Sequence, residues 1–67
     1  MKMNINYTLE KENDYYGITI ENENEKRTIF FTEHEKKAKD IFNLFKGNEV
    51  TPISMGYILD DMYEEYN

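Results

Sequence analysis

The spacing of the apolar residues changes near residue 32, and this change limits the folds open to the chain. Before that point apolar and polar residues alternate, as in Ile5, Tyr7 and Leu9. A period of two is typical of a strand with one buried face. After that point apolar residues recur every three or four positions, which is typical of amphipathic helices. We therefore predict strands in the first half and helices in the second, an α+β fold.

Three strands are predicted, over residues 4–10, 15–21 and 26–32, with polar connections at 11–14 and 22–25. Connections of four residues favour antiparallel pairing of consecutive strands, which gives a meander. The neighbours Phe30 and Phe31 cannot both face the helices from a regular strand. Either Phe31 faces the helices and Phe30 points outward, or a shift of one residue exchanges them. The first alternative places inward Ile5, Tyr7, Leu9, Tyr16, Ile18, Ile20, Ile29 and Phe31, and outward Tyr15, Gly17, Thr19, Thr28 and Phe30.

The first helix is predicted to begin near Thr32, which forms a capping-box spacing with Glu35. Gly47 is expected to end it in the left-handed conformation. Its apolar stripe is formed by Ala38, Ile41, Phe42 and Phe45.

The second helix has stronger start signals, with Thr51 as the cap and Pro52 at the first helical position. Val50 is expected to pack against Met55 as a hydrophobic staple. The stripe continues through Met55, Ile58, Leu59, Met62 and Tyr66. Gly17, within a strand, is expected to mark a bulge or a close approach of another backbone. Gly56, within this helix, either allows close packing or leaves room for a partner.

The 67 residues are expected to form one domain, residues 1–67, with both helices on one face of a three-stranded antiparallel sheet. The chain has no cysteine, which excludes disulfides and thiol nucleophiles. No basic segment followed by an apolar one opens the sequence, so we expect no secretory signal and a cytoplasmic location. The net charge of −6 argues against direct binding of nucleic acid or of an anionic membrane.

Two short motifs carry a resemblance to a known family. They are Tyr16-Gly17-Ile18 in the second strand and the run Asn48–Ile53 before an acidic C-terminal helix. Over about residues 5–66 the chain resembles a family of small, functionally uncharacterised proteins of Gram-positive anaerobes. The resemblance supports the element order and implies no chemistry.

No catalytic, metal or cofactor site is predicted. The only histidine, His34, lies between Glu33 and Glu35, and adjacent helical residues point about 100° apart, so neither carboxylate is placed to orient its ring. The acidic segments 10–14 and 21–25 alternate oxygen ligands as calcium loops do, but they lack the mid-loop glycine and lie between strands. Charged hairpin ends that protect a sheet edge explain them better.

Two surfaces are predicted to contact a partner. The acidic stripe consists of Asp60, Asp61, Glu64 and Glu65. Its carboxylates stand about 5–6 Å apart on successive helical turns and crowd the negative end of the helix dipole, although a small acidic protein must also place its charge somewhere. The aromatic set consists of Tyr15 and Phe30 on the outer sheet face, extended by Tyr57 and Tyr63 on the flanks of the second helix.

We therefore predict a non-enzymatic, acidic protein-binding module. The narrower hypothesis is an inhibitor from a phage or mobile element, of the anti-defence type such as an anti-CRISPR protein. It would block a nucleic-acid-handling host protein by occupying its basic surface. The alternative is a small cytoplasmic regulatory or accessory subunit that associates with itself through the sheet face.

Overall fold

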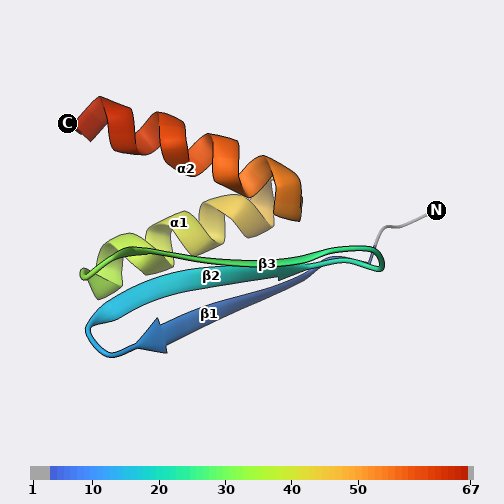
Figure 1. The fold of residues 1–67 in the computed structure, drawn as a ribbon, viewed down its shortest axis with the longest axis horizontal. Coiled ribbons are helices and arrows are strands. Elements are labelled where there is room, and N and C mark those ends of the chain that lie inside the picture. The colour runs from blue at the N-terminus through green and yellow to red at the C-terminus, as the bar shows by residue number, and fades with distance from the viewer. Residues whose placement is uncertain (1–3, 67) are drawn as a thin grey trace.

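Three strands and then two helices follow one another along the chain, so the predicted α+β fold in the order βββαα is confirmed (Figure 1). The computed structural model describes the backbone of residues 4–66 and the side chains of residues 4–62. The elements are β1 (Asn6–Glu12), β2 (Tyr15–Glu21), β3 (Lys26–Thr32), α1 (Glu35–Gly47) and α2 (Pro52–Tyr66).

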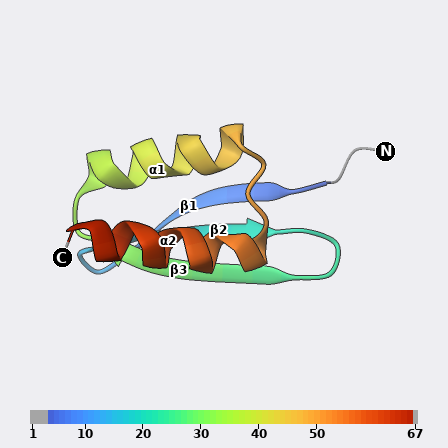
Figure 2. The same cartoon turned by 90° about the horizontal axis from the view of Figure 1, so that it is seen from above.

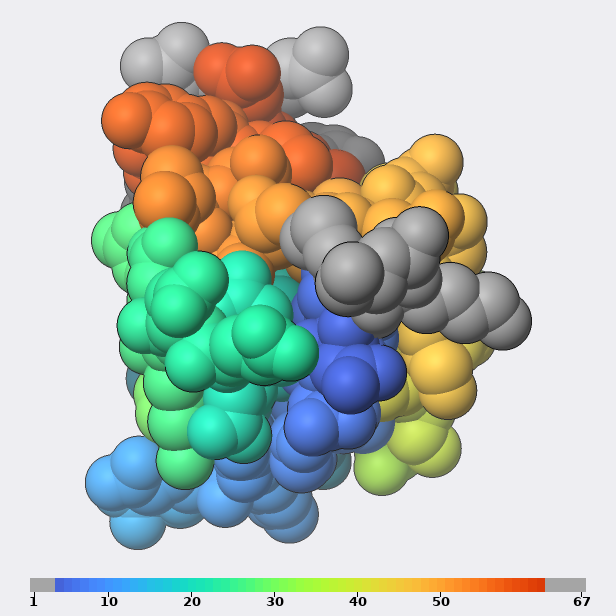
Figure 3. Space-filling view, turned by 90° about the vertical axis from the view of Figure 1, so that its right-hand side faces the viewer, coloured from blue at the N-terminus to red at the C-terminus, as the bar shows by residue number. Residues whose placement is uncertain are grey.

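The sheet is antiparallel in the order β1-β2-β3, so β1 and β3 are its two edges. Both helices cover the same face. Helix α1 lies along the β1 side and α2 lies over β3, as the view from above shows (Figure 2). Seen from the end where β2 turns into β3, the start of α2 sits on β3 while α1 flanks β1 (Figure 3). No described element covers the other face of the sheet.

The register of β3 settles the question of its two phenylalanines. Ile18 pairs with Leu9 on one side and Ile29 on the other, and all three belong to the core or pack against it. Phe31 also packs against the core, whereas Phe30 is exposed on the outer face. The first alternative for the two phenylalanines is therefore confirmed. Tyr16, which was predicted to face inward, is half-buried and is not among the side chains that pack against the core.

Gly17 is the point of closest approach between β2 and β3. The pairing shifts by one residue there, because Tyr16 pairs with Thr32 and Gly17 pairs with Phe30. A Cβ atom at Gly17 would lie 2.5 Å from the Ile29 carbonyl oxygen and 2.8 Å from the Phe30 ring. Only a residue without a side chain fits, as the sequence predicted.

The core lies between the inner face of the sheet and the facing stripes of the two helices. Both predicted helical stripes are confirmed within residues 4–62, and Tyr66 lies outside the described side chains. The buried cluster consists of Ile18, Ile20, Ile41, Phe45, Val50, Met55 and Leu59. Residues 4–66 contain no helix with the length and apolar composition needed to cross a membrane.

The first strand is shifted from its predicted range of 4–10. It continues to Glu12 and leaves a two-residue turn, Asn13–Asp14, in place of a four-residue one. Asn13 adopts φ 56°, and asparagine tolerates this left-handed conformation. Within the strand, the Lys11 ammonium lies 5.5 Å from the centre of the Tyr16 ring, which favours continued pairing over a turn.

The predicted capping box at the start of α1 is wrong. Thr32 remains in β3, and its hydroxyl accepts the backbone N–H of His34 at 3.1 Å. The helix begins later, at Glu35, with His34 as an N-cap that makes no side-chain capping bond. The sheet pairing of Thr32 with Tyr16 therefore outweighs the local helix signal.

The predicted left-handed end at Gly47 is also wrong. The helix includes Gly47, and Glu49 adopts the left-handed conformation with φ 53°. The N–H of Glu49 donates to the Lys46 carbonyl at 3.4 Å, and the N–H of Val50 donates to the Phe45 carbonyl at 3.0 Å. These two bonds form a Schellman motif, and its usual hydrophobic contact is available because Val50 and Phe45 are both buried in the core.

The start of α2 agrees with the prediction. The Thr51 hydroxyl oxygen accepts the N–H of Ser54 at 3.2 Å, and Val50 and Met55 are both buried in the core. The Tyr7 hydroxyl donates to the Val50 carbonyl at 2.9 Å, which ties β1 to the connection between the helices.

Candidate protein-binding surface

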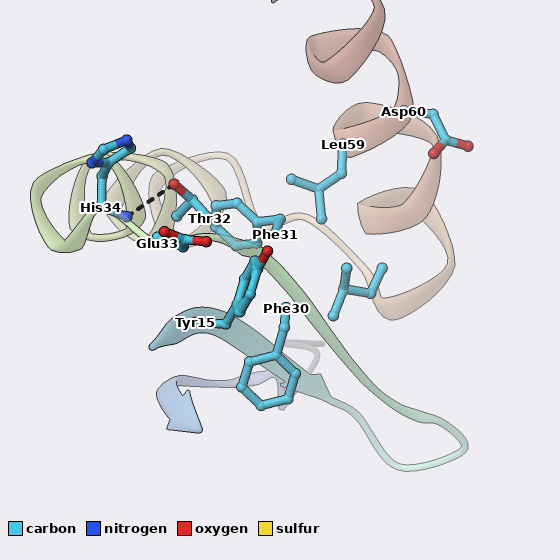
Figure 4. A pocket seen from close by; sticks show the side chains of 9 residues that line it. Tyr15, Phe30, Phe31, Thr32, Glu33, His34, Leu59 and Asp60 are labelled. Carbon is cyan, nitrogen blue, oxygen red and sulfur yellow. Dashed lines mark hydrogen bonds between the residues drawn. The ribbon is translucent and has the colours of Figure 1, made fainter. Parts of the chain in front are cut away.

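A hollow of about 510 Å³ lies beside β3, which forms one edge of the described sheet. Phe30 enters it from the outer face, while Ile29 and Phe31 enter it from the inner face. A hollow lined by both faces of a terminal strand must run along the free edge of that strand. In Figure 4, Leu59 of α2 and Phe30 lie on opposite sides of the β3 ribbon. The remaining lining residues are Tyr15, Thr32, Glu33, His34 and Asp60.

A second hollow, of about 460 Å³, continues the first toward the start of β3 and α2. It shares Ile29, Leu59 and Asp60 with the first, and its other lining residues are Arg27, Ile53, Gly56 and Tyr57. We call the two joined hollows the edge groove. It runs between the free edge of β3 and the adjacent flank of α2.

Exposed apolar side chains gather in the edge groove. Among the described side chains, the exposed fractions are 71% for Tyr57, 52% for Ile53, 49% for Tyr15 and 38% for Phe30, and all four line the groove. The other large apolar side chain with such exposure, Leu44 at 48%, lies on α1 away from it. Grouped aromatic and aliphatic side chains of this kind are typical of contact surfaces.

One basic residue, Arg27, and two acidic residues, Glu33 and Asp60, line the groove. A Cβ atom at Gly56 would be 2.8 Å from Nη1 of Arg27, so the missing side chain of Gly56 makes room for the guanidinium group. This observation supports the packing interpretation of Gly56. Arg27 forms no ion pair with another described residue. Asp60 is exposed, and its carboxylate points out from α2 (Figure 4).

The predicted site residues fall into three groups. Tyr15 and Phe30 meet in the first hollow, and Tyr57 reaches the second hollow from α2, so the aromatic set spans the β3 edge. Asp60 and Asp61 are exposed on α2. The side chains of Tyr63, Glu64 and Glu65 lie outside the described residues.

Two residues of the groove, Arg27 and Ile53, were not predicted from the sequence. Arg27 occupies an inward position of β3, where a basic residue is unexpected, and the interior glycine of α2 that accommodates it was the available signal. Ile53 lies off the buried stripe of α2, and an isoleucine at such a position is the signal of an exposed apolar contact.

Away from the β3 edge, the centre of the outer face is polar. The Thr19 hydroxyl donates to Oε2 of Glu10 at 2.7 Å, and the Thr28 hydroxyl lies 2.7 Å from that of Thr19. Since the single proton of Thr19 goes to Glu10, Thr28 donates to Thr19. These side chains form hydrogen bonds with one another across the three strands. The apolar contact area is therefore at the edge of the outer face and not at its centre.

The remaining candidate groups stand apart from the groove or at its rim. His34 is exposed where β3 leads into α1, and it lines the first hollow. The described residues contain no group of three or more histidine or acidic side chains placed to hold a metal ion.

Burial, and secondarily the nearby Glu49 carboxylate, raises the pKa of Tyr7 above its usual value of 10.0.

One family model matches the chain, over residues 1–65, and its description is "Family of unknown function (DUF6514)". Neither a curated protein nor a solved structure matches the chain.

Proposed function

Because the chain belongs to the family of unknown function DUF6514, we propose its function from the surface itself: a non-enzymatic protein-binding module that holds its partner in the edge groove. One observation carries this proposal. Four of the exposed large apolar side chains, Tyr15, Phe30, Ile53 and Tyr57, line a single groove. Covering apolar area releases about 25 cal/mol per Å², so a partner that covers this groove gains most of its affinity there.

The test compares exposed apolar residues inside and outside the groove. The tagged chain captures its partner from the native host, and the variants Ile53→Ser and Tyr57→Ser are compared with Leu44→Ser. Leu44 is as exposed as Ile53 but lies on α1, so its variant is a matched control. We expect both groove variants to lose the partner at least tenfold while Leu44→Ser retains it. Equal retention by all three would contradict the proposal.

The narrower proposal is an inhibitor from a phage or mobile element that occupies the basic surface of a nucleic-acid-handling protein. The net charge of −6 and the exposure of Asp60 and Asp61 support it. Such a protein would act in the cytoplasm, and we extend the proposal to family members in Gram-positive anaerobes. Neutralising Asp60, Asp61, Glu64 and Glu65 to Asn and Gln should abolish binding without lowering the melting temperature. Unchanged affinity would exclude this version.

The alternative is a small cytoplasmic accessory subunit that associates with itself. The feature that favours it is β3, an edge strand whose free edge borders the edge groove.

A further inference from the structure

The two edges of the described sheet differ in a way that bears on the partner. The β1 edge carries three charged residues, Glu10, Lys11 and Glu12, which oppose pairing with another strand. In β3 the charges are confined to the first two positions, and residues 28–32 form the uncharged run Thr-Ile-Phe-Phe-Thr. Alternate residues of an edge strand turn their backbone N–H and C=O groups away from the sheet. The β3 edge therefore offers backbone donors and acceptors to an extended segment of another chain.

The side chains beside this edge set the pattern of such a segment. Ile29 and Phe31 face the inner side of the sheet, and Ile53 and Tyr57 of α2 line the groove above them. Side chains of a segment paired with β3 alternate between the two faces in step with those of β3. Every second side chain of the segment therefore lies in the edge groove, where apolar residues fit.

The charge of the edge groove changes along its length. Arg27 lines only the second hollow, whereas Glu33, which follows the end of β3, lines only the first. Asp60 lines both hollows. The described lining of the first hollow thus includes two carboxylates and neither lysine nor arginine. In Figure 4, Glu33 lies on one side of Phe31 and Asp60 on the other, so a segment that crosses this hollow passes both carboxylates.

The first hollow combines these carboxylates with aromatic rings. Glu33 and Asp60 are exposed, and neither carboxylate forms an ion pair with a described residue. Tyr15 and Phe30 bring their rings to the same hollow. A guanidinium group fits this combination, because it donates two N–H groups to a carboxylate and also stacks on aromatic rings. The chemistry of the first hollow therefore favours an arginine side chain.

We propose that the occupant of the edge groove is an extended segment of a partner protein, which pairs with β3 as a further strand and places an arginine in the first hollow. This inference rests on the proposed function and names the chemistry of the segment that the groove holds. The segment carries apolar residues at every second position and its arginine at the end beside Glu33 and Asp60. Its other end lies beside Arg27, where a basic residue is disfavoured. The net charge of −6 attracts a basic segment over a longer range.

The test selects the segment without assuming its sequence. A library of random peptides of about eight residues, long enough to span residues 27–33 in the extended conformation, is displayed and selected on the immobilised chain. We expect the enriched peptides to alternate apolar and polar residues and to carry an arginine near one end. Apolar residues spaced three or four apart, which indicate a helix, would overturn the proposal. Enrichment without arginine, or no enrichment, would overturn it as well.

Charge variants then locate the arginine of the best peptide. The double variant Glu33→Gln with Asp60→Asn is expected to bind it about fivefold more weakly, because contacts between exposed opposite charges are lost. The matched control, Glu21→Gln with Asp40→Asn, removes two charges outside the groove and should leave the affinity unchanged. Circular dichroism checks that each variant is folded. Equal affinities for the two double variants would overturn the place of the arginine.

Methylation of the peptide nitrogens tests the pairing with β3. Alternate residues carry their N–H groups on opposite edges of an extended peptide, so each edge is blocked in turn. We expect methylation along one edge to weaken binding about tenfold and methylation along the other edge to have little effect. Equal effects of the two methylations would overturn the pairing.

Failure of this proposal is distinguishable from failure of the broader one. The broader proposal fails only if the Ile53→Ser and Tyr57→Ser variants keep their captured partner. Variants that lose the partner, on a chain that selects no extended peptide with an arginine, would overturn the present proposal alone.

Discussion

Single residues in this fold are constrained by backbone approach and by buried hydrogen bonds. At Gly17, the Ile29 carbonyl oxygen and the Phe30 ring occupy the space that a side chain would need. Phe30 thereby covers the bare backbone of the neighbouring strand, an arrangement known to stabilise glycine within a sheet. Tyr7 carries its hydroxyl to the Val50 carbonyl and joins the first strand to the start of α2. Each contact leads to a prediction.

Gly17→Ala is expected to destabilise the protein by about 1–3 kcal/mol, because backbone atoms of β3 must move to admit a methyl group. Gly47→Ala is the matched control. Apart from its chain neighbours and the backbone of its own helix, no described atom lies within 4 Å of a Cβ atom at Gly47. Alanine is favoured over glycine in a helix by up to about 1 kcal/mol. Urea unfolding should therefore move the two midpoints in opposite directions. A stabilised Gly17→Ala would show that β2 and β3 do not approach as described.

Tyr7 should make stability depend on pH in the alkaline range. Its pKa is raised in the folded protein, so the folded state holds the proton where the unfolded state releases it. The stabilisation is complete below pH 10 and is lost as the pH rises through the folded pKa. Tyr7→Phe should cost about 1 kcal/mol at neutral pH, from the lost bond to Val50, and should lose less stability above pH 10. Parallel alkaline losses in both proteins would contradict this assignment.

At the scale of whole elements, the periodicity of the apolar residues predicted the order, the strand parity and both helical stripes. The predictions that were wrong concern the ends of the strands and helices. The local sequence around Thr32 is compatible both with a strand residue and with a helix N-cap. Only the cross-strand pairing of Thr32 with Tyr16 decides between the two. Gly47 was the obvious helix terminator, but the buried contact of Val50 with the core places the left-handed residue two positions later, at Glu49. Long-range packing decides both cases, and a local pattern does not contain it.

The connection between the helices offers a stabilising change. Glu49 has a left-handed conformation, which costs a residue with a side chain about 1–2 kcal/mol relative to its preferred state. Glycine removes this strain but gives the unfolded chain more freedom. Glu49→Gly is therefore expected to raise the free energy of unfolding by about 0.5–1 kcal/mol. Thermal and urea unfolding with an unchanged m-value would measure the gain, and a lower midpoint would contradict the Schellman geometry.

For the whole molecule, the sequence predicted that aromatic residues face outward but not that they border a groove. Parity alone placed Tyr15 and Phe30 on the outer face, and the α2 periodicity placed Tyr57 off the buried stripe. Their common position emerges only when α2 lies over β3, because the groove is formed by both faces of an edge strand and a helix. Arg27 was missed for the same reason, since its place beside Gly56 is a tertiary contact.

The free edge of β3, beside the edge groove, is the surface that we propose a protein partner covers. Amide hydrogen exchange, measured on the protein alone and in complex with its captured partner, tests this directly because contact with the partner protects edge amides. We predict that amides of residues 27–32 exchange more slowly in the complex, while those of β1, the opposite edge, exchange at an unchanged rate. Exchange from β3 that the partner leaves unchanged, or protection that appears on β1 alone, would contradict the proposal.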